Sequence, residues 1–138
     1  MAKFDFTGLD EYVRKLNRLA DPKRAEGMIK AAVYPGAGIV ADEIRHNLEQ
    51  HSRTGDLASS LFLSVMENEG GYIYTQVGFA GYDRNGVPNA VKAAVLESGS
   101  SRQTKTPFIR PALKSTKDKA EAAMAAELES RINQLMED

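Results

Sequence analysis

The stretch SLFLSVMENEGGYIYTQVGF, residues 60–79, decides the fold class, because its residues fall into two alternating sets with the period of two of β-strands. One face of a first strand is predicted to carry Leu61, Leu63 and Val65. The matching face of a second strand would carry Ile73, Thr75, Val77 and Phe79. Residues 67–71, ENEGG, lie between the two runs and are rich in turn formers. The stretch therefore predicts an antiparallel β-hairpin.

The other face of this hairpin is largely aromatic, and would carry Phe62, Met66, Tyr72 and Tyr74. A two-stranded hairpin alone is only marginally stable in water. We therefore expect this second face to be covered, either by a helix of the same chain or by a neighbouring subunit. The sequence leaves both alternatives open.

The residues before the hairpin have the apolar spacing of helices. Spacings of three and four predict a short first helix with one apolar face, formed by Leu9, Tyr12, Leu16 and Leu19. Thr7 and Asp10 have the spacing of a capping box at its start. The pair Asp21-Pro22 is predicted to end this helix and to begin another, since Asp caps a helix well and proline is tolerated in the first turn.

A longer stripe at helical spacing predicts the main core helix, and it consists of Ile29, Val33, Gly36, Val40, Ile44 and Leu48. Pro35 lies inside this stripe and would cost about 3 kcal/mol in an unrelieved helix. We therefore expect a kink near Tyr34, or two helices in place of one. The run Gly36-Ala37-Gly38 follows no strand and precedes no Lys-Ser/Thr pair, which favours close helix packing over a phosphate-binding loop.

The sequence after the hairpin predicts two more helices. Residues 80–88, AGYDRNGVP, form a loop, and a short helix follows from Pro88 or Asn89 to Glu97 and ends at Ser98-Gly99. A terminal helix of about 25 residues has Pro111 in its first turn. Its predicted stripe is Leu113, the stem of Lys117, Ala120, Met124, Leu128, Ile132 and Leu135. The order is α-α-β-β-α-α in a single α+β domain spanning residues 1–138.

The composition bears on location and partners. The 138 residues include 18 Lys and Arg against 19 Asp and Glu, so the net charge of -1 predicts no general attraction to nucleic acid or to an anionic membrane. Disulfides and thiolate chemistry are excluded because the chain has no cysteine. No long apolar run occurs, so we expect neither export nor membrane spanning, and a protein made in the cytoplasm.

No constellation of residues predicts an enzyme, a cofactor or a metal site. Asp42 and His46 are four residues apart, but two ligands without a third do not hold zinc, which favours a solvated pair. The segment Asp83-Arg84-Asn85-Gly86 imitates a calcium loop, yet Lys92 stands where a bidentate Glu is needed. Ser98, Ser100 and Ser101 lack the Gly-x-Ser-x-Gly turn of a hydrolase. We expect a protein that is not an enzyme.

One local group of cations follows the short helix. Arg102, Lys105 and Arg110 surround a loop in which Phe108 is the one aromatic residue. Single-stranded nucleic acid is held by cations together with several stacking aromatics. This group therefore favours contact with an acidic protein surface.

Two segments are more specific than the rest, and each has a structural role. In TGDLASSL, residues 54–61, Thr54 would cap a turn, Gly55 would supply permissive dihedrals, and Leu57 would anchor the chain before Leu61 begins the strand. The second signature is LESG, residues 96–99, followed by TPFIRPAL, residues 106–113.

The second signature predicts a rigid connection into the terminal helix. Pro107 and Pro111 hold two bends around Phe108, which should be buried as an apolar anchor. Glu97 stands at the wrong end of its helix for the helix dipole. We therefore expect its carboxylate to hydrogen-bond backbone N–H groups or an arginine and to fix residues 98–107, beginning at Gly99.

In this order and spacing, the two signatures closely resemble the tail-completion family of lambdoid, siphovirus-type bacteriophages, over most of residues 20–130. The signature positions are Thr54, Gly55, Leu57, Leu61, Glu97, Gly99, Pro107, Phe108, Arg110, Pro111 and Leu113. Members are often labelled minor tail or head-to-tail joining proteins. Pro35 and the longer 80–90 loop depart from the family pattern.

The resemblance implies a structural virion protein of the neck. It would form a ring, of six copies, at the upper end of the tail tube. Its partners would be other copies of itself, the tail-tube protein and the head connector or stopper protein, and DNA would pass through without sequence-specific binding. Two other hypotheses stay open: a small adaptor or host-interaction module, and a hydrolase with an unrecognised site.

Overall fold

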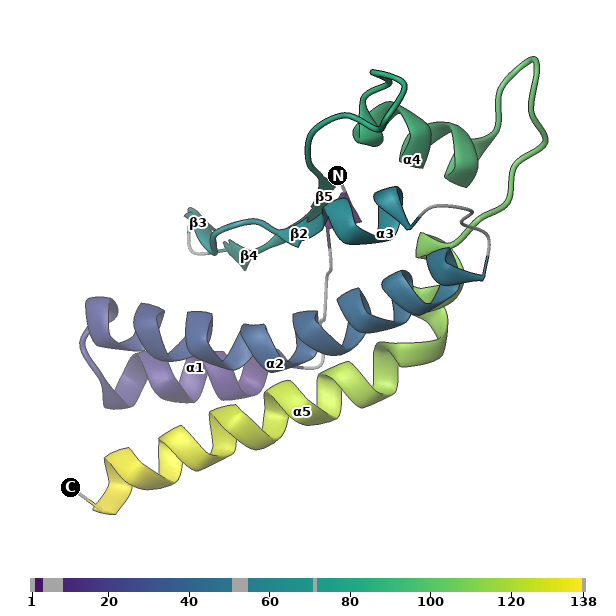
Figure 1. The fold of residues 1–138 in the computed structure, drawn as a ribbon. Helices are drawn as coiled ribbons and strands as arrows, with labels where there is room; N and C mark the ends of the chain where they lie inside the picture. The colour runs from purple at the N-terminus through teal and green to yellow at the C-terminus, as the bar shows by residue number, and fades with distance from the viewer. Residues whose placement is uncertain (1, 4–8, 51–54, 71, 138) are drawn as a thin grey trace.

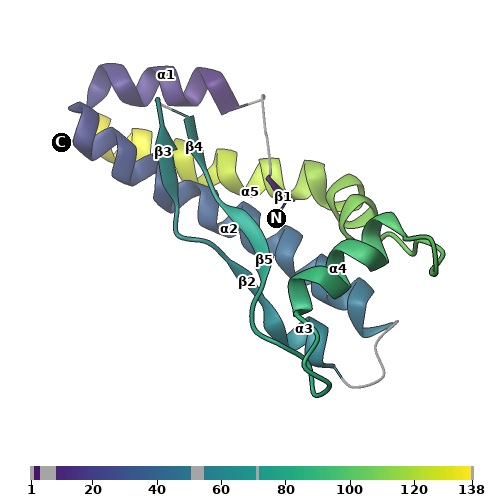
Figure 2. The ribbon, with the colours of Figure 1, turned by 90° about the horizontal axis from the view of Figure 1, so that it is seen from above.

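Three helices lie beneath a small antiparallel sheet in this computed structural model, which describes residues 2–3, 9–50, 55–70 and 72–137 (Figure 1). The helices are α1 (Asp10–Leu19), α2 (Pro22–Glu49) and α5 (Ile109–Glu137). Two views agree that α2 lies between the sheet on one side and α5 on the other (Figures 1 and 2). The predicted α+β class, with a long second helix and a long terminal helix, is confirmed.

The break between α1 and α2 occurs where the sequence predicts it. Asp21 is the N-cap of α2, and its side chain accepts a hydrogen bond of 2.9 Å from the backbone N–H of Arg24. Pro22 occupies the first turn, where its missing N–H removes no helical bond. At the start of α1, Asp10 follows Leu9, whereas the predicted cap Thr7 lies outside the described residues.

The helix α2 runs through Pro35 as one uninterrupted element, so the alternative of two separate helices is wrong. The next residue, Gly36, lies at the crossing of α2 and α5. A Cβ atom on Gly36 would lie 2.6 Å from Cγ of Met124 and 3.0 Å from the carbonyl oxygen of Ala120. The prediction of close helix packing at Gly36 is therefore confirmed.

The helix α5 buries one stripe along most of its length, at strict intervals of four: Ala112, Thr116, Ala120, Met124, Leu128 and Ile132. Its first two members correct the predicted stripe, since Leu113 is half-buried and Lys117 is exposed. The hydroxyl of Thr116 donates a hydrogen bond of 2.6 Å to the carbonyl oxygen of Ala112, and this satisfies its polar group inside the core. The stripe begins with small residues, which let α5 approach α2.

The sheet has β5 (Gln76–Phe79) at its centre, with β1 (Ala2–Lys3) on one edge and β2 (Leu61–Leu63) on the other. A second pair, β3 (Glu67–Glu69) and β4 (Tyr72–Tyr74), extends the hairpin. All these pairs are antiparallel, and the predicted hairpin is confirmed. Residues 67–69 form β3, so their assignment to the turn is wrong. No pattern in the sequence indicated the two-residue strand β1.

The alternation of the first strand breaks at Ser64. The hydroxyl of Thr75 donates to the Ser64 carbonyl oxygen at 2.8 Å, and the Ser64 hydroxyl oxygen accepts from the Gln76 N–H at 2.9 Å. Side-chain bonds of this kind compete with a regular ladder, and the chain reverses its faces here. Val65, predicted to be buried, is 79% exposed, whereas Met66 is 5% exposed.

The aromatic face of the hairpin is covered in part by this chain. Tyr74 and Met66 are buried, and α2 packs against β4. Phe62 remains 39% exposed. The side chain of Tyr72 lies outside the description. Of the two alternatives, cover by the same chain therefore holds for the β4 end, and the region around Phe62 is left uncovered.

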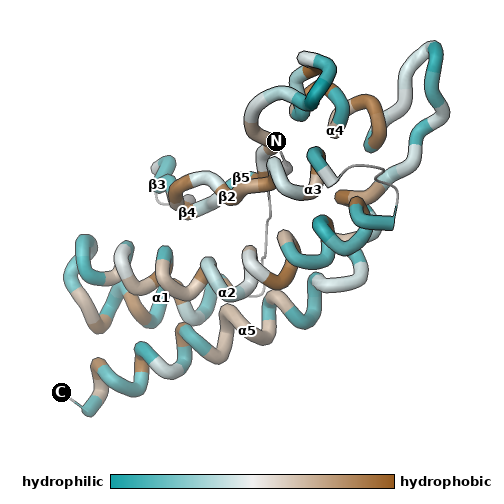
Figure 3. Tube along the Cα trace, in the orientation of Figure 1, coloured by the Kyte–Doolittle hydropathy of each residue, from teal (hydrophilic) through white to brown (hydrophobic). Residues whose placement is uncertain are grey.

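Two shorter helices complete the fold. The helix α3 (Asp56–Ser60) was not predicted as a helix, and α4 (Asn89–Ser98) has the predicted bounds. Hydrophobic segments occur along α4 and β5, above the helical layer (Figure 3). Across the described ranges, no helix is both long enough and apolar enough to cross a membrane.

Candidate interaction surface

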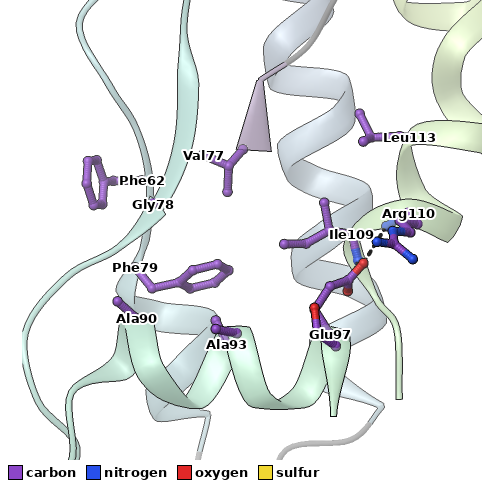
Figure 4. Close-up of a pocket in the computed structure, with 12 residues that line it drawn as sticks. Phe62, Val77, Gly78, Phe79, Ala90, Ala93, Glu97, Ile109, Arg110 and Leu113 are labelled. Carbon is purple, nitrogen blue, oxygen red and sulfur yellow. Dashed lines mark hydrogen bonds between the residues drawn. The ribbon is translucent and has the colours of Figure 1, made fainter. Parts of the chain in front are cut away.

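A groove of about 560 Å³ lies between α4, β5 and the first turns of α5 (Figure 4). Its apolar lining consists of Phe62, Val77, Gly78, Phe79, Ala90, Ala93, Ala94, Ile109 and Leu113. Glu97, Ser98 and Arg110 form a polar rim at the α5 end. The groove combines an apolar lining with a few polar groups at one end, which is the usual composition of a protein binding site.

The carboxylate of Glu97 fixes the α5 end of the groove. Its Oε2 atom accepts hydrogen bonds from the backbone N–H groups of Phe108 at 2.7 Å and Ile109 at 2.9 Å, and Oε1 accepts from Arg110 N–H at 3.0 Å. The expected contact of Glu97 with backbone N–H groups is confirmed. A carboxylate here satisfies N–H groups that have no partner within the helix, and it lies at the positive end of the α5 dipole.

Residues 99–107 close back onto the end of α4. Gly99 has a φ of 80°, a conformation that favours glycine, and a Cβ there would lie 3.1 Å from the backbone nitrogen of Lys105. The N–H of Thr106 donates to the Leu96 carbonyl oxygen at 2.7 Å. Arg102 and Lys105 are exposed on this loop, which therefore presents cations from a backbone fastened at both ends.

Phe108 anchors the same junction and is fully buried, as predicted. Its ring meets that of Phe79 edge to face, with centroids 5.9 Å apart and planes at 73°. Its carbonyl oxygen accepts a hydrogen bond of 3.1 Å from the side-chain amide of Asn47. The junction before α5 is thus held to α2, β5 and α4 together.

The first signature segment supports the core beneath the groove. Gly55 has a φ of 76° and caps α3, while Leu57 and Leu61 are buried in the same cluster as Phe108. Thr54 lies outside the described residues. The two segments that are far apart in sequence thus meet in one core, where these residues have packing roles.

The remaining signature residues lie closer to the surface. Pro107 is half-buried, and Pro111 is exposed in the first turn of α5. Leu113 and Arg110 both line the groove, the former half-buried and the latter exposed. These two residues are the signature positions, together with Glu97, that a partner in the groove would contact.

The calcium-like segment of the 80–88 loop is an internal clasp. Oδ1 of Asp83 accepts hydrogen bonds of 2.9 Å from the N–H groups of Asn85 and Val87, and Oδ2 pairs with Nζ of Lys92 at 3.1 Å. The Val87 N–H bond, with help from Lys92, holds the pKa of this carboxyl below its usual value. Its acceptor positions are occupied by the chain itself.

The other residues considered for chemistry are also engaged in local pairs. Asp42 pairs with Arg45 at 3.0 Å, and His46 lies 3.3 Å from the amide of Gln50, so the expected Asp42–His46 pair is replaced by these contacts. In the part of the chain that the structure describes, no three His, Asp or Glu side chains gather as metal ligands would. His51 lies outside that part.

Sequence reasoning missed that α4 would be only partly covered. Val91 on this helix is 52% exposed, and Tyr82 and Val87 in the loop before it are also exposed. The signal was present in NAVKAAVLES, residues 89–98, which is apolar around most of its circumference, as helices covered on several sides are.

Comparisons with protein-family models, curated proteins and solved structures find no match for this chain.

Proposed function

We propose that this chain is a structural subunit of the neck of a long-tailed bacteriophage. Copies of it would form a ring at the upper end of the tail tube, joining the tail to the head connector and leaving a channel for DNA. The observation that carries the proposal is the uncovered apolar groove, because the signature segments that resemble the tail-completion family build its α5 end.

The groove is suited to binding a protein surface. Glu97 is the carboxylate at its rim, and both of its oxygens already accept backbone hydrogen bonds. A general acid or base needs an oxygen within reach of a substrate proton. In Glu97 that capacity is used to hold α5, so this residue contributes a fixed shape and not a proton transfer.

Exposed apolar side chains beside the groove favour an assembled state. Phe62 lines the groove and is 39% exposed, while Val91 on α4 and Val87 in the loop before it are 52% and 40% exposed. Apolar surface of this kind, where it is contiguous, marks an interaction site. A contact between two different patches on identical subunits generates a closed ring when its rotation closes. This is the assembly that a neck component requires.

The charge of the chain is compatible with a channel for DNA. A net charge of -1 gives no general attraction to phosphates, so a ring of such subunits would let DNA slide. Base-specific binding needs side chains placed to reach base edges, and the loop cations are accompanied by one buried aromatic, Phe108.

Deleting the gene from its phage tests the proposal. Electron micrographs of the deletion lysate should contain full heads beside unattached tails, and supplying the wild-type chain should restore joined, infectious particles. A deletion phage that assembles complete virions at the normal yield would overturn the proposal.

A further inference from the structure

A run of cations begins beside the groove. Residues 98–117 contain no Asp or Glu, and their five cations are Arg102, Lys105, Arg110, Lys114 and Lys117. The last three follow one another at intervals of four and three along α5, which places them on one face of the helix. All three are exposed. We call Arg110, Lys114 and Lys117 the cationic stripe, and Arg110 also lines the groove.

The other end of the same helix has the opposite character. Residues 118–137 contain five carboxylates, at Asp118, Glu121, Glu127, Glu129 and Glu137, against the two cations Lys119 and Arg131. Arg131 is paired with Glu127 at 3.0 Å. Glu129 and Glu137 then remain as the excess negative charge at the end of the helix. The negative end of the α5 dipole adds to this charge.

The end of α5 also exposes an apolar side chain between carboxylates. Glu129, Asn133, Met136 and Glu137 lie at helical spacing on one face, and we call them the acidic ridge. Met136 is 64% exposed, and the two carboxylates are exposed as well. An unbranched Met side chain adapts readily to an apolar groove. The ridge therefore carries both elements that the groove and stripe would complement.

We propose that the groove receives the acidic ridge of a second copy of this chain, an inference that rests on the ring proposed above. Met136 of one copy lies against the apolar lining near Ala94 and Leu113 of the next. Glu129 and Glu137 face the cationic stripe. The complementary charges of the two ends of α5 are what identifies the occupant.

The two ends cannot meet within one chain. An α-helix rises about 1.5 Å per residue, so Met136 lies roughly 35 Å from Leu113 along α5. The ribbon places the two ends of α5 at opposite ends of the molecule (Figure 1). The contact therefore joins two different surfaces of neighbouring copies. Repeated head to tail, such a contact builds a ring when its rotation closes, whereas a reciprocal exchange between two copies would stop at a two-fold dimer.

Engineered cysteines test the contact directly, since the natural chain contains none. The variants are Met136→Cys, Ala94→Cys and the double variant, each oxidised under native conditions. The double variant should give a ladder of disulfide-linked multimers, and the two single variants mixed together should give heterodimers. Ala94→Cys combined with Tyr34→Cys, at a residue 49% exposed on α2, is the matched control and should give no ladder.

Charge reversal gives a second, independent readout. Lys114→Glu with Lys117→Glu, and separately Glu129→Lys with Glu137→Lys, should each weaken assembly by about tenfold or more in dissociation constant, as measured by sedimentation velocity. Mixing the two reversed proteins, or combining all four changes in one chain, should restore assembly. The control variant Lys15→Glu with Arg18→Glu, on α1, changes the net charge by the same amount as Lys114→Glu with Lys117→Glu. It should leave assembly intact.

The outcomes separate this inference from the function on which it rests. Rings that form without the ladder and are insensitive to both reversals would overturn the ridge-in-groove contact and leave the ring proposal standing. Cross-links that stop at the dimer would overturn the head-to-tail arrangement. Alkylation of the thiol in the Ala94→Cys variant shows what covers the groove. If duplex DNA or tail-tube protein protects this thiol and further copies of the chain do not, the groove binds that occupant instead. A chain that remains monomeric even with tail-tube and connector proteins would contradict both proposals.

Discussion

The carboxylate of Glu97, in the last turn of α4, accepts a hydrogen bond of 2.7 Å from the backbone N–H of Phe108, the last residue of the ten-residue loop that leads into α5. The last turn of α4 thereby caps the first turn of α5. Because the groove lies between these helices and β5, this one carboxylate fixes the spacing of its walls. A surface that must match a partner requires such fixed walls.

Replacing Glu97 should destabilise the fold as loss of a helix cap does. We expect Glu97→Ala to lower the free energy of unfolding by about 1–2 kcal/mol, measured by urea denaturation. Glu97→Gln keeps one carbonyl oxygen and should lose less. Glu121→Ala, also a half-buried glutamate, removes no cap from α5 and should stay within about 0.5 kcal/mol of the wild type. Equal effects of Glu97→Ala and Glu121→Ala would contradict the capping role.

A methyl group at Gly36 should separate α2 from α5. Alanine in place of glycine stabilises a helix interior by about 1 kcal/mol. Overpacking of the new methyl group against Met124 and the Ala120 carbonyl oxygen costs about 1–3 kcal/mol. Gly36→Ala should therefore lower the melting temperature. Gly38→Ala is the matched control, because a Cβ there meets no atom within 4 Å, and it should raise the melting temperature. The reverse order of the two variants would refute this crossing geometry.

Tyr74 should titrate at an unusually high pH. Its hydrogen bond to Glu67 and its burial raise the pKa from 10.0 to about 12. Because the folded-state pKa lies above the unfolded one, the stability that this bond contributes is fully present below pH 10.0 and is lost as the pH rises through about 12. Tyrosinate absorbance should show this step, and Tyr74→Phe should remove it. A wild-type curve that matches the Tyr74→Phe curve in the alkaline range would count against the bond.

The clasp at Asp83 should weaken in acid. The pKa of this carboxyl is lowered in the folded state, chiefly by the Val87 N–H, so its contribution to stability is present above the unfolded pKa and is lost as pH falls through the folded one. We expect Asp83→Asn to increase amide hydrogen exchange at residues 85–87 at neutral pH. In the wild type the same residues should exchange faster, relative to the intrinsic rate, once acid protonates the carboxyl. Unchanged protection in Asp83→Asn would show that the loop does not depend on this group.

Local chemistry explains which parts of the fold were predictable. Asp21 and Pro22 mark a helix boundary by backbone preferences that operate within a few residues. Phe108 was predicted to be buried because prolines flank a large apolar side chain, and Glu97 was predicted to find N–H donors because its position opposes a helix dipole. In each case the physical cause lies within one short segment.

The errors arose where distant segments decide the outcome. The reversal of faces at Ser64 depends on hydrogen bonds with Thr75 and Gln76 on the opposite strand. The burial of Ala112 and Thr116 in place of Leu113 and Lys117 depends on how closely α5 approaches α2. The groove itself needs three elements placed together, and only the apolar circumference of α4 indicated in advance that this helix requires cover.

Native mass spectrometry of the purified chain, alone and mixed with tail-tube and connector proteins, tests the central claim most directly. The account predicts one closed assembly of identical subunits, with six copies by the family resemblance, joined through head-to-tail contacts. A chain that is monomeric in every mixture would contradict it.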